Sequence, residues 1–245
     1  MSAIESIPKE VFVDMQNRIF EQLVHCETLG EAAQKYTALM VQHFGDSMVL
    51  CRVFVTQEFD KLPVADKASV TTIAENKGVA DKLRGTTLIL SLLGTQGVNP
   101  QWNDRRNSRG HVGVPLVTSD FVAQIPMISR LLKALGLGLD WIDSHDNDII
   151  GRTIGNMGGV FHVSDARTER DTTGRLIISA QDFVKEYGVL SVFGVGGGYI
   201  GSPMFFTVIT FLRETISRET AAKFLLHASK FKAATIRHVQ NGTIF

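Results

Sequence analysis

The sequence predicts an α+β fold in which helices flank a largely antiparallel sheet. Helical patterns lie at both ends of the chain, and short apolar or β-branched segments typical of strands lie between them. The glycine-rich segment GVGGGYIGSP joins two of these segments and leads into a further strand, MFFTVITFL, so it is typical of a hairpin. A dinucleotide-binding loop would lead into a helix instead. Strands linked in this way, with helices grouped before and after them, favour an α+β arrangement.

The N-terminal part is predicted to form two helices. Apolar side chains recur at helical spacing from Val11 to Cys26. The segment TLGE that follows has the form of a capping box, in which the Thr28 hydroxyl accepts a backbone N–H and Glu31 reaches back. The second helix is expected to stop near Gly45.

The remaining elements follow in order along the chain. Strands are predicted at residues 47–56, 86–94, 158–166, 189–195 and 204–212. Helices are predicted within 119–136, with the main one starting beside Pro126, at 179–188 and after Ser217. Segment 57–85 has many charges and weak periodicity, so we treat it as an insertion of uncertain structure. No linker rich in Pro, Gly or Ser divides the chain, and one domain over residues 1–245 is expected.

Composition and charge narrow the class of function. The 25 Lys and Arg balance the 25 Asp and Glu, so no strong field draws the chain to nucleic acid or an anionic membrane. No apolar run approaches the roughly 18 residues that span a bilayer, and the N-terminus lacks a signal-peptide pattern. Cys26 and Cys51 are far apart in sequence and fit two reduced thiols. We therefore expect a cytoplasmic protein that binds neither nucleic acid nor membrane.

Motifs for several common chemistries are missing from the sequence. It holds no phosphate-binding GxxxxGK[ST] loop, no GxSxG nucleophile elbow and no HExxH pair. The acidic segment DSHDND, 143–148, lacks the glycine and glutamate of a calcium-binding loop, so a solvated turn is favoured. We predict no catalytic residue and no metal ligands, and the sequence leaves the cofactor unknown.

One polar segment, QWNDRRNSRGHVGVPL at 101–116, follows directly after a core strand and is a candidate ligand-binding loop. Its arginines could grip a carboxylate or phosphate, and its tryptophan could stack on a flat ligand. The predicted ligand-binding residues are Trp102, Arg105, Arg106, Arg109, His111 and, on a later strand, His162. The alternative is a solvated loop whose arginines pair with Asp104 and other acids, and both interpretations stay open at this point.

Three stretches resemble a known family. LGEAAQKYTALMVQHFGDSMVLCRVFVT is similar to the opening helix and first strand of a GAF domain. FHVSDARTERDTTGRLIISAQDFVKEYGVLSVFGVGG and MFFTVITFLRETISRETAAKFLLHASKFKAATI resemble its later part, its last strand and its terminal helix. The pattern is particularly similar to GAF-like regions ahead of bacterial sensor kinases. Residues 57–150 depart from it as an enlarged middle insertion, and no chromophore-attachment context matches.

The resemblance implies a small-molecule-sensing domain of bacterial signalling that acts through protein–protein contacts without catalysis of its own. The ligand is expected between the sheet and the segments around 101–163. Terminal helices often form the dimer surface in GAF-like proteins, so a homodimer through Ala221, Phe224, Ala228 and Phe231 is considered. Packing of this stripe on the chain's own sheet is the simpler alternative.

The sequence also fits two other classes of function. The chain could be an enzyme that uses His111 or His162 as proton carrier beside an acid such as Asp165. It could instead be a structural module that dimerises through an apolar patch on its terminal helices.

Overall fold

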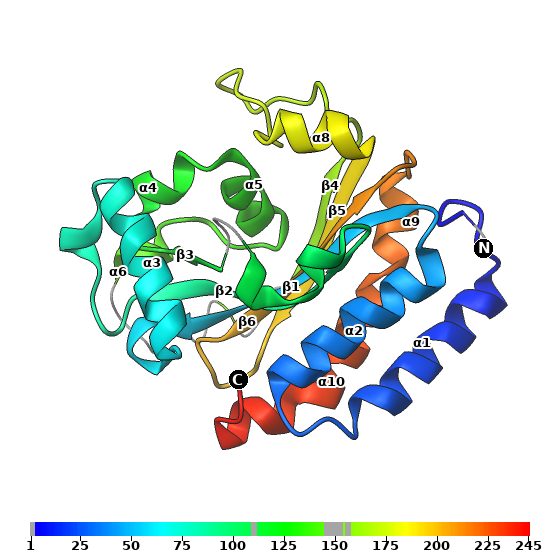
Figure 1. The fold of residues 1–245 in the computed structure, drawn as a ribbon, viewed down its shortest axis with the longest axis horizontal. Helices are drawn as coiled ribbons and strands as arrows, with labels where there is room; N and C mark the ends of the chain where they lie inside the picture. Colours follow the sequence, from blue (N-terminus) through cyan, green and yellow to red (C-terminus); the bar gives the residue numbers. More distant parts are fainter. Residues whose placement is uncertain (1–2, 109–111, 145–153, 155–157) are drawn as a thin grey trace.

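The computed structural model describes residues 3–108, 112–144, 154 and 158–245. In this part of the chain, six strands form one antiparallel sheet in the order β3-β2-β1-β6-β5-β4 (Figure 1). The strands are β1 (Met48–Glu58), β2 (Leu88–Gly97), β3 (Gly113–Pro115), β4 (Gly158–Val163), β5 (Ser191–Gly198) and β6 (Phe205–Leu212). The prediction of an α+β fold with a central antiparallel sheet flanked by helices is confirmed.

Helices from both ends of the chain cover one face of the sheet, which we call the terminal-helix face. They are α1 (Lys9–Leu23), α2 (Leu29–Phe44), α9 (Arg218–Lys223) and α10 (Leu225–Asn241). α1, α2 and α10 lie side by side, with α2 packed on β1 and β2 and α10 on β5 (Figure 1). The predicted cap of α2 is confirmed, because Thr28 Oγ1 accepts the Glu31 N–H at 3.0 Å. The Glu31 carboxylate reaches back one residue further than expected and accepts the N–H of Glu27 at 2.7 Å.

The apolar stripe considered as a dimer surface lies inside the domain. Ala221, Phe224, Ala228 and Phe231 are all at most 5 % exposed. The Phe231 ring packs against Phe206 of the sheet, with centroids 4.9 Å apart. Of the two alternatives for this stripe, the simpler one holds: the stripe packs the terminal helices onto the chain's own sheet.

The other face of the sheet, which we call the insertion face, is covered by elements from the middle of the chain. They are α3 (Val64–Asn76), α4 (Ser119–Ala123), α5 (Pro126–Ala134), α6 (Trp141–Ser144) and α8 (Gln181–Tyr187). Pro126 begins α5 as predicted. α3 lies in the segment 57–85 that the sequence left undefined. It buries only Asp66, Val70 and Ala74, a line too narrow to give a clear helical pattern. None of the helices in the described ranges is long and apolar enough to cross a membrane.

Strand β3 is short and leaves part of the β2 edge without a neighbouring strand. Side chains form hydrogen bonds with the backbone N–H and C=O groups there. Gln34 of α2 accepts the Thr95 N–H at 3.1 Å and donates to the Thr95 carbonyl at 2.9 Å. Asn103 accepts the Gly97 N–H at 2.9 Å. These bonds replace a neighbouring strand and hold the loop after β2 against the sheet edge.

The contact between α2 and β2 is so close that it requires a glycine. A Cβ atom at Gly94 would lie 2.3 Å from the backbone carbonyl of Ala33. Gly94→Ala is therefore expected to lower the free energy of unfolding by about 1–3 kcal/mol, because the helix must move off the strand. The matched control is Gly158→Ala, where the nearest atom to the added Cβ is 3.8 Å away. Urea unfolding compares them, and equal midpoints would contradict the close approach.

Candidate functional site

The arginines of the predicted loop that the structure describes bind acids of the same chain. Arg105 Nη1 lies 2.6 Å from Asp66 Oδ2 of α3, and both side chains are largely buried. Its guanidinium also lies 5.2 Å from the centre of the Phe245 ring. Arg106 is exposed and binds Asp104 at 2.6 Å. These hydrogen bonds from Arg106 lower the pKa of Asp104 to about 2. Arg105 and Arg106 thus each pair with an acid of the same chain, Asp66 and Asp104, although Arg105 is largely buried and not solvated.

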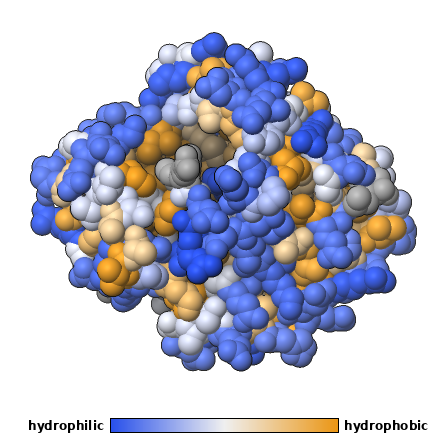
Figure 2. All heavy atoms as spheres, viewed as in Figure 1, coloured by the Kyte–Doolittle hydropathy of each residue, from blue (hydrophilic) through white to orange (hydrophobic). Residues whose placement is uncertain are grey.

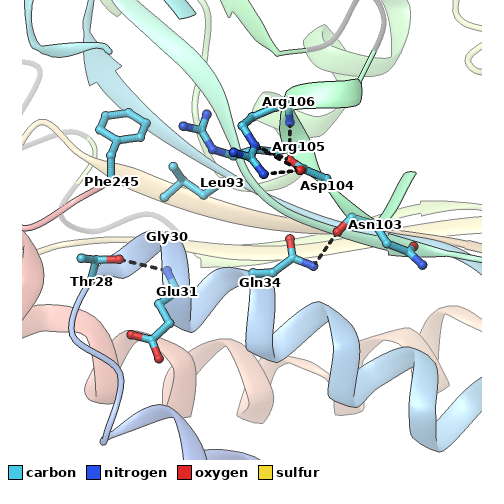
Figure 3. A pocket seen from close by; sticks show the side chains of 10 residues that line it. All are labelled: Thr28, Gly30, Glu31, Gln34, Leu93, Asn103, Asp104, Arg105, Arg106 and Phe245. Atoms are coloured by element: carbon cyan, nitrogen blue, oxygen red, sulfur yellow. Dashed lines mark hydrogen bonds and ion pairs between the residues drawn. The ribbon is translucent and has the colours of Figure 1, made fainter. Parts of the chain in front are cut away.

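A cavity of about 370 Å³ lies beside these arginines, between the start of α2, the loop and Phe245 (Figure 3). It is lined by Thr28, Gly30, Glu31, Gln34, Leu93, Asn103, Asp104, Arg105, Arg106 and Phe245. The first N–H groups of α2 are already bonded, since Gly30 donates to the Ile244 carbonyl at 2.7 Å. Both arginines of its lining are held by carboxylates. This cavity therefore offers a weak site for an anion.

The predicted ligand-binding residues do not converge on one point. Trp102 packs against α8, with its ring centre 5.6 Å from Phe183 and 4.6 Å from Tyr187. His162 lies on β4, at the opposite edge of the sheet from the loop. Arg109 and His111 lie outside the described residues. Trp102 thus lies on the insertion face, whereas Arg105 and Arg106 line the cavity beside α2.

The histidine and acid of the enzyme hypothesis have other partners. His162 Nε2 lies 2.9 Å from the backbone carbonyl of Ile216. The Asp165 carboxylate binds Arg167 at 2.9 Å, and this bond lowers the pKa of Asp165 to about 2. An acid–base pair of His162 with Asp165 is therefore not supported by this arrangement.

A residue that the sequence reasoning missed is the strongest candidate: Arg52, in the middle of β1. Its side chain projects onto the insertion face together with Leu50 and Phe54, because side chains alternate along a strand. Arg52 Nε is enclosed and has no hydrogen-bond partner. Nη2 lies 3.5 Å from Ser108 Oγ, at the outer limit of a hydrogen bond. Within the described part of the chain, no carboxylate pairs with this guanidinium.

Burial lowers the pKa of Arg52 to about 10, so the guanidinium stays protonated at neutral pH. An unpaired charge in apolar surroundings costs free energy. One feature of the sequence could have indicated this site: Arg52 is the one charged residue in the strand segment SMVLCRVFVT.

A second unsatisfied polar group lies directly opposite Arg52. Thr95 of β2 is the cross-strand partner of Arg52, so the two side chains project from the same face. Thr95 is completely buried, and its Oγ1 has no hydrogen-bond partner. Buried polar groups are almost always bonded in folded proteins, to protein, water or a bound molecule. Two such groups therefore lie side by side on one sheet face with unused hydrogen-bonding capacity.

The insertion side of the molecule is also hollowed. Figure 2 shows a recess between the regions that Figure 1 assigns to α5 and α8, with hydrophobic residues at its floor. Both helices belong to the layer on the insertion face, and α5 packs on β4 of the sheet. Among the described residues, no group of three or more His, Cys, Asp or Glu is arranged to hold a metal ion.

The fold and this site define the class: an α+β domain with one apolar sheet face that carries a half-buried cation. Solved structures similar to the chain include the GAF domain of a phosphoenolpyruvate-protein phosphotransferase from Acinetobacter. This match has a TM-score of 0.46 and 11% identity, and it covers 95% of this chain and 96% of that one. The GAF domain of the corresponding Coxiella burnetii protein has a TM-score of 0.44 and 12% identity, over 94% and 95% of the two chains.

A third similar structure is a far-red-absorbing protein in its dark state with bound biliverdin IXa. It has a TM-score of 0.43 and 10% identity, and the match covers 92% of this chain and 99% of that one. No family model matches the sequence, and no curated protein matches it.

Proposed function

We propose that this chain is a GAF-like sensory domain that binds a small molecule on the insertion face of its sheet. It passes the signal on through contacts with other proteins, as part of bacterial signalling in the cytoplasm, and has no catalysis of its own. The observation that carries the proposal is Arg52, a guanidinium that faces apolar neighbours with its Nε unbonded. A sequence selected only for a stable core would hold an apolar residue at this position, because pairing or removing a buried charge is cheaper than leaving it alone.

The two native tryptophans provide a direct test of this location. Trp102 and Trp141 are the two tryptophans of the chain, and both pack in the core of the insertion face. Native mass spectrometry of the freshly purified protein shows whether a small molecule is retained, and a metabolite panel follows by thermal unfolding. A ligand at about 100 times its Kd is expected to raise Tm by roughly 5–10 °C. The same ligand is expected to change the tryptophan fluorescence.

Two variants locate the binding site. Arg52→Gln is expected to reduce the thermal shift, whereas Arg18→Gln, an exposed cation on α1, is expected to leave it unchanged. The proposal fails if no molecule is retained and no metabolite shifts Tm. It also fails if a ligand raises Tm without any change in tryptophan fluorescence, because that ligand binds elsewhere, for example in the cavity beside α2.

A further inference from the structure

We infer that the ligand of the insertion face is an organic monoanion, a carboxylate carried on an apolar or aromatic body, whose head group binds Arg52 and Thr95. This inference rests on the proposed function and specifies the chemistry of its ligand.

The charge of the site selects an anion with a single negative charge. The planar guanidinium presents parallel N–H donors that match the two oxygens of a carboxylate. In Arg52 the Nε–H is unbonded and Nη2 has only the long contact to Ser108 Oγ, so this edge of the guanidinium has no strong hydrogen-bond partner of its own. Within the described ranges no second cation forms a hydrogen bond with the Thr95 hydroxyl or with Ser108 Oγ. A dianion would therefore keep one charge uncompensated in apolar surroundings, at a cost in desolvation.

Thr95 supplies a hydroxyl at the same place. A threonine hydroxyl donates one hydrogen bond, and a carboxylate oxygen beside Arg52 would accept it. Two hydrogen bonds to Gln34 hold the backbone of Thr95. They fix the point on the strand from which the hydroxyl-bearing side chain projects. The pairing of β1 with β2 also shifts register between Val53 and Phe54, next to Arg52. Such bulges are common beside functional sites, where they re-aim side chains.

The body of the ligand is expected to be apolar because the rest of the surface is. Leu50 and Phe54 flank Arg52 along β1, and Ile209 lies opposite it on β6. Gly97 lies two residues after Thr95 on β2. The Trp102 ring packs against it, and a Cβ atom at Gly97 would lie only 2.8 Å from this ring. An aromatic cluster of Trp102 with α8 therefore begins roughly 7 Å along the strand from the polar pair. This spacing suits a molecule with a charged end and a flat or aliphatic remainder.

A matched pair of fluorescent probes tests the inference. 8-Anilinonaphthalene-1-sulfonate and N-phenyl-1-naphthylamine have the same ring system, and only the first carries an anionic group. The wild-type protein is expected to bind the anionic probe about 10-fold or more tightly than the neutral one, as a charge-assisted contact implies. In Arg52→Gln this preference is expected to fall to about 1, and in Thr95→Val by about 3-fold. Arg18→Gln is expected to keep the wild-type preference, since Arg18 is exposed on α1.

Competition against the bound anionic probe then identifies the head group. 1-Naphthoate is expected to compete at least 10-fold better than 1-naphthamide, which has the same shape without the charge. 1-Naphthyl phosphate, a dianion near neutral pH, is expected to compete more weakly than the carboxylate. A phosphate that competes better overturns the monoanion inference.

The outcomes separate the two proposals. If neither probe binds the natively folded wild-type protein, the proposed function of the insertion face fails. If both probes bind equally well to the wild type, the inference fails and the proposed function stands. The wild-type comparison decides this point even if Arg52→Gln does not fold. A cooperative unfolding transition of each variant, recorded without probe, ensures that the fluorescence reports the native state.

Discussion

Arg105→Met is expected to lower the free energy of unfolding by about 3 kcal/mol, because it leaves the Asp66 carboxylate buried without its partner. Arg105 Nη1 and Asp66 Oδ2 are 2.6 Å apart, and the side chains are 21% and 8% exposed. Methionine keeps most of the apolar stem of arginine, so the loss reports the missing charge rather than a cavity. Urea unfolding at neutral pH, with an unchanged m-value, measures the difference.

Two further variants show whether the buried ion pair is the cause. Arg106→Met removes an exposed arginine from the same loop, and it is expected to leave the urea midpoint nearly unchanged. Arg105→Met combined with Asp66→Leu is expected to recover most of the loss, because no isolated charge remains. Equal effects of Arg105→Met and Arg106→Met would contradict this account. Loss of ligand binding at unchanged stability would instead restore the original prediction that Arg105 binds a ligand.

The strands other than β3 and the cap of α2 could be predicted because their signals are local. The strand segments are continuous apolar runs, and the glycine-rich segment between β5 and β6 permits a hairpin with Gly201 at a φ of 76°. The cap of α2 needs only Thr28 and Glu31, three residues apart. Such features depend on neighbours along the chain, so periodicity and residue type are sufficient to find them.

The partner of Arg105 could not be predicted, because it is distant in sequence. Arg105 finds Asp66 in α3, a helix that buries too few positions to be recognised from its pattern. Trp102 meets α8 more than eighty residues later in the chain. A cluster of arginines therefore indicates anion binding only when the fold shows that no acidic residue of the same chain already pairs with them.

Arg52 shows the opposite situation. A lone charge within an apolar strand is visible in the sequence, but its meaning depends on the face it occupies and on its neighbours there. Only the register of β1 with β2 and β6 brings Thr95 and Ile209 beside it. The polar pair arises from strand pairing, which no short motif records.

Acid is expected to destabilise the domain through His227, a buried histidine between the terminal helices. His227 is 2 % exposed on α10, and its ring lies against Phe12 of α1 and Phe224. Burial lowers its pKa to about 3, and the nearby Lys230 and His43 act in the same direction. In the unfolded chain, a histidine titrates near 6.5. Below about pH 6.5 the unfolded chain therefore binds a proton that the folded chain does not.

The sign of the effect follows from this difference in proton binding. The stability that His227 contributes is complete above about pH 6.5 and is lost as the pH falls toward 3, by up to about 1.4 kcal/mol for each pH unit. Between pH 6.5 and 4.5 the loss is expected to be about 2–3 kcal/mol. The exposed carboxylates of Asp104 and Asp165, with pKa values of about 2, contribute below this window. The interval therefore reports mainly on buried histidines, and Glu5 and Glu169, whose pKa values are also lowered, contribute only near its acidic end.

His227→Phe is expected to flatten the pH dependence of stability across this interval, because phenylalanine fits the surrounding aromatic rings and binds no proton. Urea midpoints at pH 7, 6, 5 and 4.5 measure the slope for wild type and variant. His43→Gln, at a partly buried histidine of α2 whose pKa is also lowered by burial, is expected to remove only a smaller part of the slope. Parallel wild-type and His227→Phe curves would mean that protonation of His227 does not limit stability, and that the helix layer opens to water around this ring before the domain unfolds.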